Sequence, residues 1–151
     1  MKISQIMTKK VITATAEMGI EKVASLLTKY RIHGVPVIDK NRKVIGIATE
    51  VDFFTKSKEN IYLPQYISLL KKVNPSQIDS EKQKEFLNKI REAKIGDIMT
   101  ANCICLDENS SISDAIKIFK KNHFNMLPVV NSKKQLAGVV SLSDLIKLIK
   151  K

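Results

Sequence analysis

The pattern of apolar and polar positions in this chain occurs twice, with a separation of 92 residues. Residues 2–53 align with residues 94–145 without a gap and share 12 identities in 52 positions. Composition alone would give about three or four identities, and most mismatched pairs keep their apolar or polar character. The sequence therefore predicts two similar structural units in one chain of 151 residues.

Each unit is expected to begin with an amphipathic turn, a brief strand and an amphipathic helix. The strand is predicted at 11–13 in the first copy and at 103–105 in the second. Ser111 and Asp114 have the spacing of a helix-capping pair at the start of the second copy's helix. Apolar residues at helical spacing predict the buried face of each helix: Ile20, Val23, Ala24, Leu27 and Tyr30 in the first copy, and Ile112, Ala115, Ile116 and Phe119 in the second.

Two apolar strands, joined by a polar turn, and a final helix complete each unit. The last helix is expected to begin near residue 50 in one copy and near residue 142 in the other. The strands are predicted near 34–38, 44–48, 126–130 and 136–140.

These strands are apolar on both faces, so one face of each unit needs a cover. A unit of roughly 55 residues is also marginal when it folds alone. We therefore expect an α/β (α+β) fold in which two β-α-β-β-α repeats, residues 1–56 and 94–151, pack about a pseudo-twofold axis.

Residues 57–93 interrupt the repetition and are predicted to be helical. The apolar residues between Ile61 and Val73 are spaced for one amphipathic helix, which Asn74-Pro75 would end. Ser80-Glu81-Lys82-Gln83 has the pattern of a capping box for a second helix that carries Ile90. This insertion is interpreted as a helical connector folded against the repeats, with a docking or dimerisation arm as the alternative.

The chain is basic, with 26 Lys and Arg against 15 Asp and Glu, for a net charge of +11. Only three of the basic residues are arginines, and aromatic residues make up 5% of the chain. Arginine forks and aromatic rings are the usual means of holding phosphates and bases. A solvated lysine-rich surface is therefore favoured over a nucleic-acid interface, which remains the alternative explanation of the charge.

No apolar run reaches the roughly 18 residues of a membrane helix, and residues 1–5 lack the apolar stretch of a signal peptide. A cytoplasmic protein without a membrane partner is therefore expected. Cys103 and Cys105 lie in a predicted strand, where alternate residues share a face. Two ligands without a further Cys or His pair do not make a zinc site, so both are interpreted as small buried hydrophobic residues and no metal is expected.

One repeated motif has candidate chemistry: Gly-φ-φ-Thr/Ser-x-x-Asp, where φ is apolar, at 46–52 and at 138–144. The glycine lets a ligand or another backbone approach a strand closely. The hydroxyl and the carboxylate lie where that strand turns into a helix, and a carboxylate accepts hydrogen bonds from a vicinal diol such as ribose. The same spacing is also that of an ordinary helix cap, and the residues alone leave both interpretations open.

Together these motifs resemble tandem CBS domains, the two-repeat unit called a Bateman module. The resemblance covers about residues 1–56 and 94–149. It rests on three motifs present in both copies: Ile6-Met7-Thr8 and Ile98-Met99-Thr100; His33-Gly34-Val35-Pro36-Val37-Ile38-Asp39 and Asn125-Met126-Leu127-Pro128-Val129-Val130-Asn131; and Gly46…Thr49…Asp52 and Gly138…Ser141…Asp144.

The resemblance implies two clefts between the repeats that bind adenosine-containing ligands such as AMP, ADP, ATP or S-adenosyl compounds. In similar modules the motif Asp holds the ribose hydroxyls, a role that falls here on Asp52 and Asp144. The resemblance also implies a flat, disc-like homodimer. The remaining contacts that it implies are Thr49 and Ser141 near ribose or phosphate, backbone around Ile12, Thr13, Gly34 and Val35 at one adenine, and backbone around Ile104, Cys105, Met126 and Leu127 at the other.

The two copies differ where similar modules often carry a basic residue that meets a phosphate. The first copy has His33 there, whereas the second has the uncharged Asn125 and Met126. We therefore hypothesise that the Asp144 cleft, which His33 faces, takes a phosphorylated nucleotide better than the Asp52 cleft. His33 is otherwise an ordinary surface or partly buried histidine, and this is the interpretation of His123, which has no counterpart in the first copy.

No nucleophile elbow, zinc-protease helix or phosphate-binding loop occurs in the sequence, so no catalytic residue is assigned and the chain is not expected to be an enzyme. The leading hypothesis is a regulatory module that binds an adenosine ligand and signals to a separate protein partner by a conformational change. The alternative is a ligand-free scaffold or a basic protein associated with nucleic acid.

Overall fold

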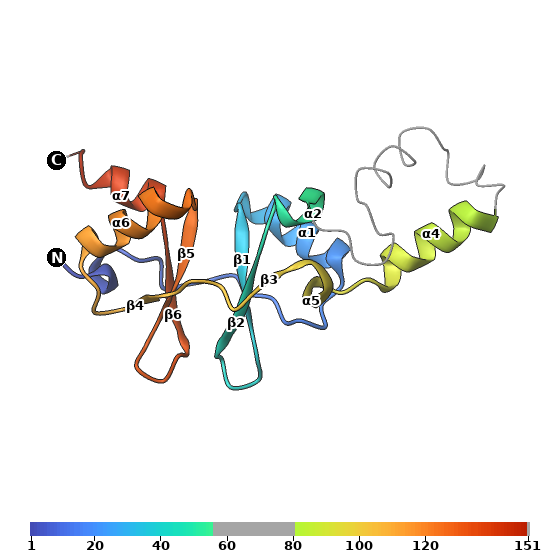
Figure 1. Ribbon diagram of the computed structural model, residues 1–151, viewed down its shortest axis with the longest axis horizontal. Helices are drawn as coiled ribbons and strands as arrows, with labels where there is room; N and C mark the ends of the chain where they lie inside the picture. Colours follow the sequence, from blue (N-terminus) through green and yellow to red (C-terminus); the bar gives the residue numbers. More distant parts are fainter. Residues whose placement is uncertain (56–80, 151) are drawn as a thin grey trace.

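The computed structural model describes residues 1–55 and 81–150, and these form two three-stranded sheets that lie side by side (Figure 1). The predicted mixed α and β fold class is confirmed. The first sheet has the order β1 (Gly34–Ile38), β2 (Val44–Thr49), β3 (Thr100–Ala101), and the second has the order β4 (Leu106–Asp107), β5 (Met126–Val130), β6 (Leu136–Ser141).

The two long hairpins have the same register. β1 pairs antiparallel with β2 from Gly34↔Thr49 onward, and β5 pairs with β6 from Met126↔Ser141 onward, each residue 92 positions after its counterpart. The polar turns close in the same way: Asp39 Oδ1 accepts from the amides of Asn41 and Lys43, while Asn131 Oδ1 plays this part in the other hairpin.

The helices cover the sheets in matching pairs. The helices α1 (Ile20–Tyr30) and α2 (Asp52–Thr55) accompany the first sheet, and α6 (Ile112–Asn122) and α7 (Leu142–Lys147) accompany the second, all toward the top of Figure 1. As predicted, Ser111 caps α6, because its Oγ accepts the amide of Asp114 at 3.1 Å. The short helices η1 (Ile3–Gln5) and α5 (Ile95–Ile98) open the two repeats.

The leading segment of each repeat packs on the sheet of the other repeat. Thr8 pairs with Val139 of β6, with N···O distances of 2.8 and 3.0 Å, and β3 of the second repeat pairs with β2 of the first. Ile3 is buried in the core of the second sheet, whereas Ile95 and Ile98 are buried in the core of the first. Each core is therefore closed by residues from both halves of the chain.

This exchange explains why the strands predicted at 11–13 and 103–105 are wrong. Residues 102–105 cross from β3 in the first sheet to β4 in the second (Figure 1), so they span the space between sheets instead of pairing. In both repeats the parallel pairing begins at the residue that follows the predicted strand. This residue is Leu106 of β4 in the second repeat, and it is Ala14, which forms an isolated bridge with Val37, in the first.

A reciprocal pair of hydrogen bonds joins the two hairpins near their turns. The amide of Val44 donates to the carbonyl of Lys134 at 3.4 Å, and the amide of Leu136 donates to the carbonyl of Arg42 at 2.9 Å. If each residue is replaced by its counterpart in the other repeat, 92 positions away, the first bond becomes the second. A pseudo-twofold axis between the repeats requires this relation.

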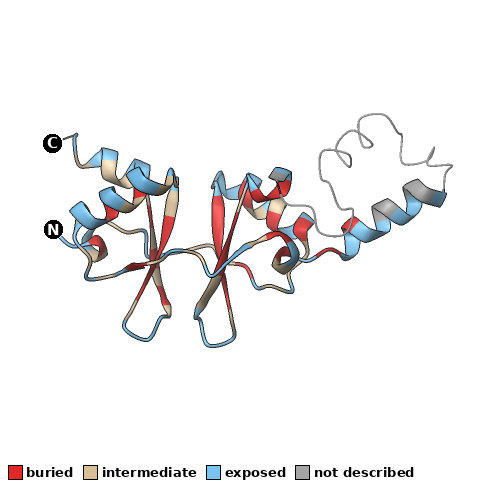
Figure 2. Cartoon of the chain, viewed as in Figure 1, coloured by how far each residue is buried: buried red, intermediate tan, exposed pale blue. Residues whose placement is uncertain are grey.

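The cores lie between each sheet and its helices (Figure 2), and β1 is buried along its whole length. Of the helix positions predicted to be buried, Ile20, Val23, Leu27, Ala115 and Phe119 are buried, and Ala24 and Ile112 are partly buried. Two were wrong: Tyr30 is 47% exposed at the last turn of α1, and Ile116 is 48% exposed because it lines a groove between α6 and α7.

Part of the predicted insertion is seen as α4 (Glu81–Glu92), which projects away from the repeats in Figure 1. Its last turn is anchored by Ile90, which is 1% exposed within the first core, and α4 contacts α1. The helix expected from Ile61 to Val73, its end at Asn74-Pro75 and the Ser80 cap lie outside the described residues. No helix within 1–55 and 81–150 has the length and apolar character needed to cross a membrane.

The motif glycines allow the exchange of segments. A Cβ on Gly46 would lie 2.6 Å from the carbonyl oxygen of Thr100, and a Cβ on Gly138 would lie 2.7 Å from Met7 Sδ and 2.8 Å from the carbonyl oxygen of Thr8. These separations are too short for a side chain, so each glycine admits the backbone of the other repeat's leading segment.

Gly46→Ala and Gly138→Ala are each expected to destabilise the protein by about 1–3 kcal/mol, because the added methyl group forces the crossing segment away from its sheet. Urea unfolding monitored by circular dichroism measures this effect. Gly19→Ser is the control, since no heavy atom lies within 4 Å of a Cβ at Gly19. Full stability in both alanine variants would show that the close approach is not needed.

Candidate functional site: two clefts between the repeats

Two cavities lie between the repeats and are related by the pseudo-twofold axis. The Asp52 cleft, of about 400 Å³, is lined by Thr49, Glu50 and Asp52 together with Thr100, Ile104 and Met126 from the second repeat. The Asp144 cleft, of about 550 Å³, is lined by Ser141 and Asp144 together with Thr8, Ile12, Arg31 and Gly34 from the first. Because the leading segments cross, each cleft contains residues from both repeats.

Asp144 lies where β6 turns into α7. Its Oδ2 accepts from the amide of Ser141 at 2.9 Å and from Ser141 Oγ at 2.8 Å, while Lys147 Nζ lies 3.2 Å from its Oδ1. Burial raises the pKa of this carboxyl, but the hydrogen bonds from Ser141 and the Lys147 ammonium lower it more, so the pKa lies below its usual value. Asp144 is therefore an ionised acceptor at neutral pH.

Asp52 occupies the matching position, as the first residue of α2 just after β2, and is 5% exposed. Its Oδ2 accepts from the amide of Thr49 at 2.8 Å and from Thr49 Oγ1 at 3.2 Å. Its Oδ1 accepts from Thr100 Oγ1 at 3.1 Å, so a hydroxyl from the other repeat already reaches this carboxylate.

Both aspartates therefore act as helix-capping residues, and both also line a cleft. The two interpretations of the Thr/Ser-x-x-Asp motif describe different atoms of the same side chain. One carboxylate oxygen closes the cap, and the other faces a hydroxyl or an ammonium group.

Five of the eight residues expected near adenine line a cleft. Ile12 and Gly34 line the Asp144 cleft, and Ile104, Met126 and Leu127 line the Asp52 cleft. Thr13, Val35 and Cys105 are not among the lining residues, and Val35 is fully buried in the first core. Met126 lines both cavities, at the point where they adjoin.

His33 lies at the boundary between the two clefts and lines both. Its Nδ1 is 3.2 Å from Glu50 Oε2, and both side chains are more than half exposed. Asn125, its counterpart in the second repeat, also lines both clefts. His123 lines the Asp52 cleft, so it lies closer to a candidate site than its interpretation as an ordinary histidine suggested.

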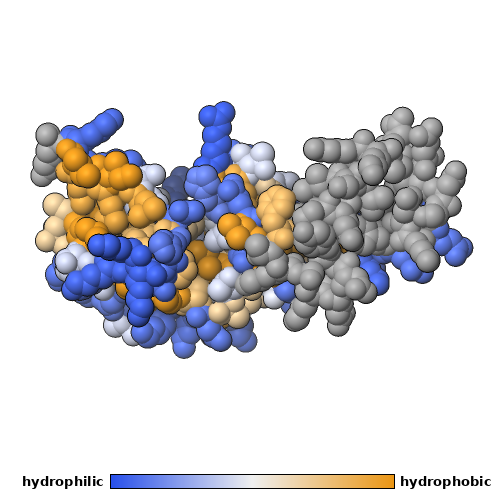
Figure 3. All heavy atoms as spheres, turned by 45° about the horizontal axis from the view of Figure 1, so that its top comes forward, coloured by the Kyte–Doolittle hydropathy of each residue, from blue (hydrophilic) through white to orange (hydrophobic). Residues whose placement is uncertain are grey.

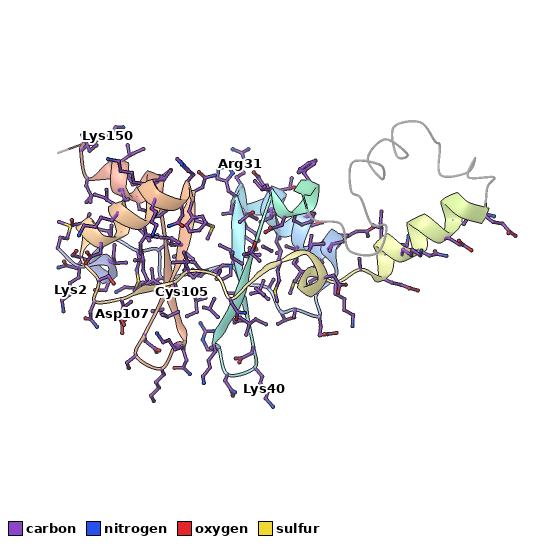
Figure 4. All side chains as sticks on the ribbon, viewed as in Figure 1. Lys2, Arg31, Lys40, Cys105, Asp107 and Lys150 are labelled. Atoms are coloured by element: carbon purple, nitrogen blue, oxygen red, sulfur yellow. The ribbon has the colours of Figure 1, made fainter. Side chains whose placement is uncertain are left out.

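Sequence reasoning missed three basic residues of the Asp144 cleft: Lys10, Arg31 and Lys147. Figure 4 labels Arg31 above β1, where α1 has ended. The alignment of the two repeats contained a signal for these three residues, because the matching positions of the other repeat hold Asn102, His123 and Thr55, none of which is Lys or Arg. Only the fold, however, brings these residues to one cavity.

The two cysteines are half-buried, not buried as expected, and their sulfur atoms are 4.0 Å apart. Figure 4 labels Cys105 on the segment that crosses between the sheets. The hydrogen bond between them and burial raise the pKa of Cys103, while the same hydrogen bond lowers the pKa of Cys105. Among the side chains of the described segments, no three His, Cys, Asp or Glu residues could hold one metal ion together.

Comparison with known proteins supports the repeat structure. A family model described as "CBS domain" matches residues 3–59 and 95–151. An uncharacterised protein of Methanocaldococcus jannaschii, MJ1426, is 32% identical over 144 residues, which cover 92% of this chain and 86% of that protein.

Solved structures share the fold. CBSX2 of Arabidopsis thaliana, crystallised with AMP, matches with a TM-score of 0.72 and 19% identity over 99% of this chain and 98% of that one. The CBS domain pair of protein MJ0100, solved with 5′-methylthioadenosine and S-adenosyl-L-methionine, matches with a TM-score of 0.70 and 23% identity over 99% of each chain. With two matched repeats that span most of its length, the chain belongs to the CBS domain family.

Proposed function

We propose that this chain is a regulatory module that binds an adenosine-containing ligand (AMP, ADP, ATP or an S-adenosyl compound) in the clefts between its repeats. The observation that carries the proposal is the position of Asp52 and Asp144, each at the edge of a cavity with an apolar wall. An apolar slot suits an adenine ring, and a carboxylate beside it accepts hydrogen bonds from both ribose hydroxyls.

The structural relatives favour an adenosine ligand. CBSX2 was solved with AMP, and the MJ0100 pair with 5′-methylthioadenosine and S-adenosyl-L-methionine. The roles proposed here are ribose binding by Asp52, Thr49, Asp144 and Ser141, and phosphate binding near His33. The adenine would lie against backbone near Ile12 and Gly34 in one cleft, and near Ile104 and Met126 in the other.

Binding between the repeats gives a physical route to regulation. A ligand that contacts both repeats stabilises the relative placement of the repeats in which those contacts are made. A separate protein that recognises this placement then responds to the ligand, and in this proposal the chain itself catalyses no reaction. The alternative, a scaffold or nucleic-acid-associated protein that acts through its +11 charge, requires neither cleft.

Asp144→Ala is expected to weaken AMP binding at least tenfold, because it removes an ionised acceptor of two ribose hydroxyls. Asp114→Ala is the control, since at the start of α6 Asp114 likewise accepts from a serine hydroxyl three residues earlier and donates its amide to that hydroxyl, but lines neither cleft. Isothermal calorimetry with AMP measures the affinity, and thermal unfolding shows whether both variants lose similar cap stability. Equal AMP affinity in the two variants would contradict the proposal, as would salt-sensitive nucleic-acid binding with no response to any adenosine compound.

We further propose that the chain forms a homodimer through an apolar groove between α6 and α7. The groove, of about 450 Å³, includes Ile116, Leu142, Ile146 and Ile149, which are 39–82% exposed. Figure 3 shows hydrophobic side chains gathered over this end of the molecule. In the first repeat α4 packs against the matching helix α1, whereas within 1–55 and 81–150 no helix covers the groove of the second. A twofold-related copy of the same groove would bury these residues.

Ile146→Glu is expected to convert the dimer to a monomer, because it places a charge in the middle of an apolar contact. Light scattering coupled to size exclusion measures the mass. Lys133→Glu, at the exposed turn between β5 and β6, should leave the dimer intact although it alters the net charge more. A wild-type monomer at all concentrations, or a dimer in both variants, would rule out this interface.

A further inference from the structure

The two clefts differ in charge at positions that the pseudo-twofold axis makes equivalent. Arg31 in the Asp144 cleft corresponds to His123, and Lys10 corresponds to Asn102. Glu50 in the Asp52 cleft corresponds to Leu142. The Asp144 cleft thus has three Lys or Arg side chains and one carboxylate, whereas the Asp52 cleft has two carboxylates and no Lys or Arg.

Two of these differences, Arg31/His123 and Glu50/Leu142, lie in equivalent backbone settings and are differences of side chain alone. Asn102, by contrast, has a positive φ of 50° that Lys10 does not share. Arg31 and His123 both occupy the left-handed C-cap of their helices, with φ of 51° and 53°. The amide of Glu50 donates to the carbonyl of His33 at 3.0 Å, just as the amide of Leu142 donates to the carbonyl of Asn125 at 3.1 Å.

The Asp144 cleft suits a ligand with an anionic 5′ group. Arg31 is exposed and presents the planar fork that binds phosphate oxygens well. Lys10 and Lys147 add positive charge to the same cavity. Lys147 contacts Asp144 but is 73% exposed, so it is free to rotate toward a phosphate and leave the carboxylate to the ribose.

The Asp52 cleft has the opposite character although the protein as a whole is strongly basic. Glu50 and Asp52 would repel a phosphate, and the rest of the lining includes Ile47, Ile104, Phe124 and Met126. An apolar wall beside a carboxylate favours a thioether or a sulfonium group over a phosphate. His33 holds Glu50 at this boundary by its 3.2 Å contact.

On the basis of the proposed function, we infer that the two clefts bind different classes of adenosine compound. The Asp144 cleft takes adenosine 5′-phosphates. The Asp52 cleft takes adenosine derivatives whose 5′ group is uncharged or cationic, such as a thioether or a sulfonium. Each partly exposed charge contributes roughly two- to fivefold to affinity, and the charge differences together give a preference of about tenfold or more at each cleft.

The test titrates AMP, 5′-methylthioadenosine and S-adenosylmethionine into the full chain by calorimetry. Asp144→Ala should remove most AMP binding and spare 5′-methylthioadenosine, and a variant at Asp52 should do the reverse. Asp52→Asn is used beside Asp52→Ala, because asparagine keeps an oxygen that can accept the Thr49 amide if alanine impairs folding.

Two substitutions, each of which introduces the residue found at the matching position of the other repeat, then test whether charge causes the ligand preference. Arg31→His should weaken AMP binding about two- to fivefold and leave 5′-methylthioadenosine binding unchanged. Lys22→Gln, which removes an exposed charge outside both clefts, should change neither. In the Asp144→Ala background, Glu50→Leu should strengthen AMP binding and weaken S-adenosylmethionine binding, with the uncharged 5′-methylthioadenosine as reference.

The outcomes separate this inference from the function on which it rests. If neither the three compounds nor ADP and ATP bind the wild-type chain, the proposed function fails and the inference fails with it. If the compounds bind but depend on the same aspartate, or if the Arg31 and Glu50 exchanges affect all three alike, the division between clefts is wrong and the proposed function stands.

Discussion

The close passage of one repeat's backbone over the other repeat's sheet is the contact on which the rest of this structure depends. Thr8 lies on β6 where Gly138 leaves room for it, and Thr100 lies on β2 where Gly46 does the same. A repeat of this size is marginal alone, and here neither core is complete without a segment of the other. The folding of the two halves is therefore coupled, because each core includes residues from both.

The same crossing creates the clefts. The segment that leaves β3 for β4 brings Thr100 and Ile104 to the Asp52 cleft, and the first repeat's segment brings Thr8 and Ile12 to the Asp144 cleft. A ligand in either cleft contacts both repeats, so its binding free energy stabilises one placement of the repeats relative to each other. The capping aspartates add a local link, because the carboxylate that faces the cleft also holds the start of α2 or α7.

The sequence allowed prediction of the repeat, the hairpins, the main helices and the capping contacts of both motif aspartates, because each has a local pattern: period, turn residues or capping spacing. The strands predicted at 11–13 and 103–105 were wrong because these segments, although their local sequence is typical of a strand, cross between the two sheets. That path depends on tertiary packing, which the local sequence does not show. Ile116 looked like a core residue for a similar reason, because helical spacing does not distinguish a face toward the sheet from one toward a groove. Lys10 and Arg31 became candidate site residues only when the fold brought segments 21 residues apart to one cavity.

The central claim is that the seam between the repeats binds an adenosine compound through the motif aspartates. A crystal structure of the chain grown with AMP tests it most directly. The account predicts the nucleotide in the Asp144 cleft, with its ribose hydroxyls on the Asp144 carboxylate and its phosphate beside Arg31. An AMP molecule bound elsewhere on the surface, or clefts that remain empty at saturating AMP, would contradict it.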